Sequence, residues 1–144
     1  MTVHLEALAA SNRNKALRTI ALVSASLADY RPFDPEAGYT PKELEPYDAL
    51  ADRFVRAIEC CLRYFRSREL LDFAEQSDAT RSLLNRMEKL GLISQASLWL
   101  EMRNVRNRIV HDYLPTQTAQ LFAAIASTYG TELARVQRAL EALD

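Results

Sequence analysis

Four polar side chains between residues 103 and 111 are of types that could act on a phosphate group. Arg103, Asn107 and His111 recur every four residues and would share one strip of a helix, while Arg106 precedes His111 by five residues. An imidazole can exchange its proton near neutral pH. A guanidinium can bind phosphoryl oxygens through two hydrogen bonds. If this protein does chemistry, we expect Arg106 and His111 to carry it, with Asn107 and Arg103 in support.

Arg106 is unusual because its apolar neighbours follow the helical period. Drawn as one helix, residues 94–114 place seven apolar or aromatic side chains on an arc of about 140°. These residues are Leu98, Trp99, Met102, Val105, Ile109, Val110 and Tyr113. Arg106 projects into the middle of this arc, where a guanidinium is costly unless it is paired or borders water. Two interpretations stay open: a buried ion pair with Asp52 or Glu59, or a functional group in a cleft.

Other kinds of site find little support in the sequence. The three glycines are far apart, so no glycine-rich phosphate loop is present. Cys60 and Cys61 are adjacent and His4 is remote, which does not supply the spaced ligand pairs of a zinc site. We therefore expect neither a metal nor a cofactor. Adjacent cysteines rarely bridge each other, so we expect reduced thiols, with Cys61 as a small core residue.

The composition is that of a globular protein without a strong charge. The chain has 144 residues, of which 49% are hydrophobic and 26% charged, and its net charge is -1. This predicts a single domain over residues 1–144. No apolar run reaches the ~18 residues of a membrane span, and the first residues lack an apolar signal core. We expect a cytoplasmic protein that does not enter the membrane.

A net charge near zero excludes a broadly basic nucleic-acid-binding protein and leaves only a local patch. Two groups of basic residues could provide it. They are Arg53, Arg56, Arg63, Arg66 and Arg68 in one group, and Arg81, Arg86, Lys89, Arg103 and Arg108 in the other. Each group is also compatible with an ordinary solvated face. If the two faces meet around a cleft, they form a basic funnel.

Helical spacing predicts the elements that position these groups. One face over residues 3–30 carries Leu5, Leu8, Leu17, Ile20, Leu27 and Tyr30. Thr40 and Glu43 fit a capping box, but Pro46 predicts that the main second helix begins at about residue 47. The buried stripe of that helix consists of Leu50, Phe54, Ile58, Cys61 and Phe65.

The second half of the sequence predicts three more helices. Asp78 is the expected cap of a short helix that stops at Gly91. A fourth helix is expected from about Ser94 to just before Pro115. A fifth carries an apolar stripe with members from Leu121 to Leu143 and is expected to bend at Gly130. Together these elements predict an all-α fold, an antiparallel up-and-down four-helix bundle with an additional short helix.

The run RNRIVHDY (residues 106–113) combines Arg106, Asn107, His111 and Tyr113 in a pattern that resembles the signature of the HEPN superfamily. The longer stretch LLNRMEKLGLISQASLWLEMRNVRNRIVHDY resembles the HepT-like toxins of HEPN/MNT (HepT/MntA-type) toxin–antitoxin modules, whose antitoxin is a minimal nucleotidyltransferase (MNT). The resemblance implies a metal-independent endoribonuclease with Arg106 and His111 as catalytic residues and Asn107 as support. The RNA 2′-hydroxyl would attack the adjacent phosphate, with His111 as acid/base and Arg106 stabilising the charge, which gives a 2′,3′-cyclic phosphate.

The same resemblance implies a partner and a modification. Tyr113 is either a packed aromatic or, as in HepT-like proteins, the tyrosine to which the antitoxin transfers AMP, which would block the cleft with phosphate charge. Because one chain offers a single suitable histidine, we expect a homodimer whose composite site supplies both base and acid. Such a dimer would also cover the apolar flank around Trp99.

Two alternatives remain. The bundle could be a non-catalytic nucleotide- or substrate-binding subunit of a minimal nucleotidyltransferase, in which Arg106 only holds a phosphate. It could also be a structural helical adaptor, in which Arg106 is only the member of an ion pair.

Overall fold

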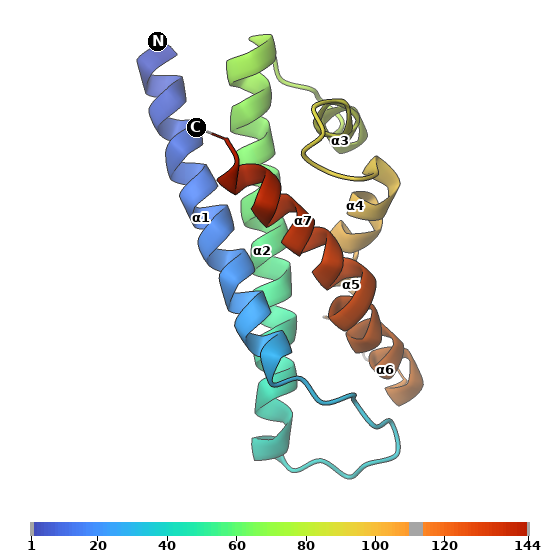
Figure 1. Ribbon diagram of the computed structural model, residues 1–144. Coiled ribbons are helices and arrows are strands. Elements are labelled where there is room, and N and C mark those ends of the chain that lie inside the picture. The colour runs from blue at the N-terminus through green and yellow to red at the C-terminus, as the bar shows by residue number, and fades with distance from the viewer. Residues whose placement is uncertain (1, 110–113, 144) are drawn as a thin grey trace.

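The computed structural model describes residues 2–109 and 114–143, and every regular element in these residues is helical (Figure 1). Two long antiparallel helices, α1 (Thr2–Ala28) and α2 (Pro41–Phe73), lie side by side. The other elements are α3 (Thr80–Lys89), α4 (Ala96–Arg103), α5 (Val105–Ile109), α6 (Pro115–Ala124), a π-helical turn η1 (Ile125–Tyr129) and α7 (Gly130–Glu141). The predicted all-α bundle is confirmed. None of the described helices has the length and apolar character needed to cross a membrane.

The contact between α1 and α2 forms the centre of the core. The predicted stripe of α2 is confirmed, because all five of its residues are at most 2% exposed. On α1 the buried face is centred on Ala9, Ala16, Ile20 and Val23, whereas Leu8 is 42% exposed. The expectation for Leu8 is therefore wrong. Small side chains at Ala9 and Ala16 allow a close helix–helix approach, which turns that face inward and leaves residue 8 in solvent.

The start of α2 differs from the prediction. The helix begins at Pro41 rather than at residue 47, although the capping box is present: the Glu43 N–H donates to Thr40 Oγ1 at 3.2 Å, and the Thr40 N–H donates to Glu43 Oε1 at 2.9 Å. Pro46 lies inside the helix at an exposed position. It removes one intrahelical donor there, and the capped first turn tolerates this loss.

The ends of α3 are determined by different residues than expected. The predicted stop at Gly91 is confirmed: its φ is 78°, its N–H donates to Glu88 O, and the Leu92 N–H donates to Met87 O, both at 3.0 Å. The predicted cap at Asp78 is wrong, because Ala79 occupies the N-cap position and makes no side-chain hydrogen bond.

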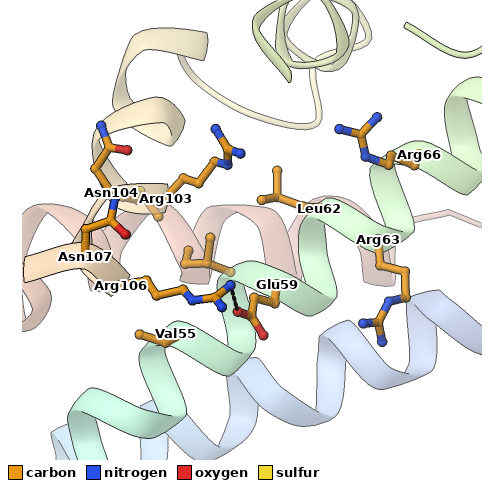
Figure 2. A pocket seen from close by; sticks show the side chains of 11 residues that line it. Val55, Glu59, Leu62, Arg63, Arg66, Arg103, Asn104, Arg106 and Asn107 are labelled. Carbon is orange, nitrogen blue, oxygen red and sulfur yellow. Dashed lines mark hydrogen bonds and ion pairs between the residues drawn. The ribbon is translucent and has the colours of Figure 1, made fainter. Parts of the chain in front are cut away.

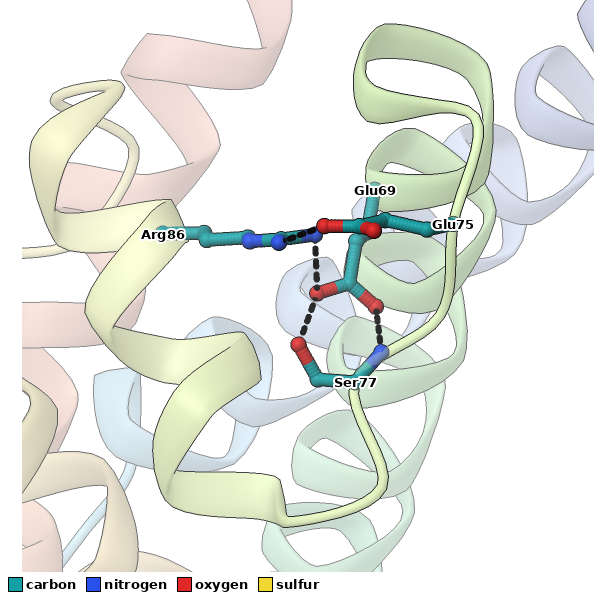
Figure 3. A network of polar contacts seen from close by, with 4 residues as sticks. All are labelled: Glu69, Glu75, Ser77 and Arg86. Carbon is teal, nitrogen blue, oxygen red and sulfur yellow. Dashed lines mark hydrogen bonds and ion pairs between the residues drawn. The ribbon is translucent and has the colours of Figure 1, made fainter.

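A buried carboxylate holds the loop before α3 instead (Figure 3). Glu69 on α2 is fully buried and accepts hydrogen bonds from the Ser77 N–H at 2.8 Å and the Ser77 hydroxyl at 2.5 Å. Arg86 on α3 donates to the same Glu69 oxygen as the Ser77 hydroxyl, Oε2, at 3.2 Å, and also pairs with Glu75. Because a buried charge is stable only when it is paired and hydrogen-bonded, this network ties α3 to α2.

The last predicted helix is less regular than expected. It corresponds to α6, which begins at Pro115, the π-helical turn η1 and α7, and η1 leads directly into Gly130, where a bend was expected. A Cβ at residue 130 would lie 2.7 Å from Ile125 O and 2.9 Å from Leu27 Cδ1. Glycine therefore allows the first residue of α7 to lie close both to η1 and to the end of α1.

Candidate functional site

The predicted fourth helix is interrupted at Asn104. α4 ends at Arg103 and α5 begins at Val105, so the expectation of one continuous helix from Ser94 is wrong within the described residues. The Asn104 N–H is shared between Leu100 O and Glu101 O, and the Asn107 N–H donates to Asn104 O at 3.1 Å. These short-range bonds tighten the chain and change the phase of the helix. Val105 is nevertheless fully buried and Ile109 packs against the core, so these two positions keep to the predicted apolar arc, whereas Arg106 does not.

Trp99 anchors this broken helix to the core. Its side chain is fully buried against Phe65, and its indole N–H donates to the buried carboxylate of Glu132 on α7 at 2.7 Å. The same carboxylate oxygen accepts from the Ser94 N–H at 3.0 Å. The expectation that a second subunit covers the flank around Trp99 is wrong, because the protein's own helices already cover it.

Arg106 lies at the surface and not in the core-facing arc. Its side chain is 68% exposed, and its guanidinium donates to Glu59 Oε1 at 2.9 Å. Glu59 is thus the partner that one interpretation proposed, but the burial proposed with it is wrong. Asp52, the other proposed partner, pairs with Arg56 instead. Exposed pairs of this kind contribute about 0–1 kcal/mol, so Arg106 is not held in place for stability.

A cleft of about 690 Å³ lies between α2 and the α4–α5 segment (Figure 2). We call it the arginine cleft. Its lining residues are Val55, Ile58, Glu59, Leu62, Arg63, Arg66, Met102, Arg103, Asn104, Arg106 and Asn107. Four arginines and one glutamate give this lining a formal charge of +3, in a chain whose net charge is -1. The basic funnel that the sequence suggested is present on a smaller scale.

Most of the other basic residues in the two predicted groups have local partners. The pairs are Arg53 with Leu22 O and Ser26 Oγ, Arg56 with Asp52, Arg68 with Asp72, Arg86 with Glu69 and Glu75, and Arg108 with the Tyr129 hydroxyl. Within the described residues, no carboxylate pairs with Arg63, Arg66 or Arg103. The cleft therefore concentrates the cations that are available to a ligand.

A second contact fixes the far side of α5. Tyr129 in η1 donates to Glu101 Oε2 at 2.6 Å and accepts from Arg108 at 3.4 Å. Burial, together with the hydrogen bond to Glu101, raises the pKa of Tyr129, so the phenol remains a neutral donor. α5 is consequently held between α2 and η1.

Three of the predicted site residues share the cleft: Arg103, Arg106 and Asn107. His111 and Tyr113 lie outside the described residues, and their place in the site stays a prediction. Arg63 and Arg66 also line the cleft, although their charge alone does not distinguish them from the other arginines of the second helix. Arg63 and Arg66 follow Glu59 by four and seven residues. This helical spacing would have placed the three side chains on one face of the helix.

The described cysteines and acidic residues do not form a second candidate site. Cys61 is fully buried, as predicted for a core residue, and burial raises the pKa of its thiol. The described part of the chain contains no group of three or more His, Cys, Asp or Glu side chains arranged to hold a metal ion.

Fold and site together define a small helical bundle with an arginine-lined surface cleft. The family model for nucleotidyltransferase substrate binding protein-like proteins matches residues 11–142. The chain belongs to this family, whose name implies association with a nucleotidyltransferase. Neither the curated proteins nor the solved structures gave a match.

Proposed function

We propose that this protein is a HepT-like toxin of the HEPN superfamily, a metal-independent endoribonuclease controlled by a nucleotidyltransferase antitoxin. The observation that supports this proposal is the arginine cleft. It brings Arg106 and Asn107, the first two residues of the RNRIVHDY run, next to three further arginines on a surface that RNA can reach. An overall near-neutral protein with one such concentration of positive charge attracts phosphate locally.

In the proposed reaction the 2′-hydroxyl of RNA attacks the adjacent phosphorus and the 5′-oxygen of the next nucleotide leaves. His111 takes the proton from the 2′-hydroxyl or delivers one to the leaving oxygen. Arg106 binds the phosphoryl oxygens, on which negative charge increases in the transition state. Asn107 and Arg103 orient the substrate. The products are a 2′,3′-cyclic phosphate and a 5′-hydroxyl.

Cleavage of RNA in EDTA tests the proposal. The wild-type protein should cut RNA in the presence of the chelator, and Arg106→Ala and His111→Ala should each abolish cutting while keeping the helical circular dichroism spectrum. Arg135→Ala, which removes an exposed cation of α7 outside the cleft, is the matched control and should cut normally. Products that carry a 3′-hydroxyl and a 5′-phosphate would refute the mechanism.

The nucleotidyltransferase partner is proposed to transfer AMP to Tyr113. The adduct would add a phosphodiester charge next to the cleft and occupy it. Mass spectrometry after co-expression with the partner should find one adenylyl group on the wild-type protein and none on Tyr113→Phe. An unmodified wild-type protein that is nevertheless inhibited would rule out this form of control.

A homodimer is proposed to complete the site, because cleavage uses both a base and an acid and each chain supplies one His111. On dilution, the activity per protein molecule should therefore fall in parallel with the dimer fraction measured by sedimentation velocity. A monomer with full activity would contradict the composite site.

The second candidate function is a non-catalytic subunit that binds the substrate of a nucleotidyltransferase, and the family description favours it. The arginine cleft would then hold the phosphates of that substrate. This reading predicts that the purified protein leaves RNA intact in EDTA, but that Arg106→Ala weakens the substrate affinity of the nucleotidyltransferase complex.

A further inference from the structure

The arginine cleft holds its guanidinium groups at two separate centres. Figure 2 shows the Arg66 and Arg103 guanidinium groups extending to one side of Leu62, and the Arg106–Glu59 pair on the other side. Arg63 also lines the cleft, but its guanidinium points away from that of Arg66. The centre formed by Arg66 and Arg103 therefore comes from α2 and α4. The centre at the Arg106–Glu59 pair comes from α5 and α2.

The two centres differ in how their charge is balanced. Glu59 neutralises Arg106 at 2.9 Å. At the other centre, Arg66 has one long hydrogen bond, 3.4 Å to Thr80 Oγ1, and Arg103 is exposed. No carboxylate of the described residues pairs with either. Two like charges that face one volume without a counter-ion favour the binding of an anion.

The spacing of the centres indicates an extended anion with more than one phosphate. Positions 59 and 66 are seven residues apart, which is a rise of about 10 Å along α2. Leu62 lies between them and presents an apolar surface, which suits a ribose or a base better than a third charged group. A volume of about 690 Å³ is also more than a single phosphate would fill.

We infer that Arg66 and Arg103 form a second phosphate subsite, which binds the phosphodiester flanking the one at Arg106 in a single strand of RNA. This inference rests on the proposed function, because it takes RNA as the ligand of the cleft. The two arginines hold the same phosphate, so they act on affinity as one unit. They do not touch the reacting atoms and serve to position the strand.

The salt dependence of binding measures the subsite directly. Each phosphate contact to a single strand contributes about 0.7 to the slope of log affinity against log salt. A fluorescent 2′-O-methyl RNA oligonucleotide cannot be cut through its 2′-oxygen, so fluorescence anisotropy reports binding alone. Arg66→Ala and Arg103→Ala should each lower the slope by about 0.7 and weaken binding about tenfold. The double variant should lower the slope no further.

The control is Arg135→Ala, which removes an exposed arginine outside the cleft and should leave the slope unchanged. In cleavage assays, Arg66→Ala and Arg103→Ala should raise KM and leave kcat near the wild-type value. Unchanged slopes, or losses that add in the double variant, would overturn the shared subsite.

The outcomes separate this inference from the proposed function. If the wild-type protein does not cut RNA but both variants show the predicted slope, the subsite is correct and the nuclease proposal is wrong. If cutting depends on Arg106 while both variants bind and cut normally, the nuclease proposal stands and the subsite is wrong.

Discussion

Replacing Glu59 by glutamine tests whether Arg106 is available to an anionic ligand. The side chains of this ion pair are 46% and 68% exposed. Since exposed pairs contribute about 0–1 kcal/mol, Glu59→Gln should lower the free energy of unfolding by no more than about 1 kcal/mol. Chemical denaturation followed by circular dichroism measures this change.

The effect on RNA binding should have the opposite sign. In the wild-type protein a phosphate must displace the Glu59 carboxylate from Arg106, so the free energy of the pair is lost on binding. If that free energy is at most about 1 kcal/mol, removing the competitor improves affinity by up to about fivefold. The variant should therefore bind the 2′-O-methyl oligonucleotide about two- to fivefold more tightly in anisotropy titrations at constant salt.

Asp52→Asn is a closely matched control. Asp52 also lies on α2, is 64% exposed and pairs with Arg56, but neither residue lines the cleft. Both substitutions remove one negative charge from the same helix. If Asp52→Asn improves affinity as much as Glu59→Gln, the gain comes from net charge and not from freeing Arg106. Weaker binding by Glu59→Gln would show that the carboxylate orients Arg106 for its ligand, and would refute the reasoning.

Three further predictions concern the scaffold. Glu132→Ala leaves the buried Trp99 indole N–H and the partly buried Ser94 N–H without their acceptor and should cost about 2–4 kcal/mol in urea unfolding. Glu141→Ala, exposed on the same helix, should cost less than about 0.5 kcal/mol. Gly130→Ala should lower Tm although alanine favours helices, because its Cβ would lie 2.7 Å from a backbone carbonyl oxygen; an unchanged or higher Tm would contradict this close contact. Burial, and to a smaller extent the neighbouring Tyr39, raises the pKa of Tyr47 from 10.0 to about 12. The neutral phenol therefore stabilises the fold below pH 10, and this contribution is lost as the pH rises through 12. Tyr47→Phe should therefore lose less stability than the wild type over that interval, and equal losses would show that other groups cause alkaline unfolding.

Periodicity and local hydrogen bonding were sufficient to predict the buried stripe and the capping box of α2 and the end of α3. The stripe from Leu50 to Phe65 is predictable because its residues all lie on one long, uninterrupted helix. The helical period therefore keeps them on the same buried face. The capping box at Thr40 and the stop at Gly91 are predictable because they depend on residues within one turn of the helix end. Pro46 misled the prediction, because a capped turn can absorb one missing donor.

The surroundings of Arg106 could not be predicted in the same way. The arc assumed that one helix continues past Asn104. With the interruption there, Val105 stays buried in the core but Arg106 lies at the surface. The interruption arises where α4 is already fixed by Trp99 and the chain must still reach the next contact, between Arg108 and Tyr129. Those partners are 33 and 21 residues away in sequence, and helical periodicity carries no information about them.

The position of one wall of the arginine cleft also depends on residues that are distant in sequence. α4 is one wall of the arginine cleft, and the carboxylate of Glu132 holds the beginning of that helix through Ser94 and Trp99. α2 is the other wall, and it is held independently by its long contact with α1. A loss of the Glu132 contacts should therefore displace Arg103 but not Arg66. In RNA titrations of Glu132→Ala under conditions where the variant stays folded, the salt slope should fall toward that of Arg103→Ala, since a phosphate held by two arginines needs both walls in place.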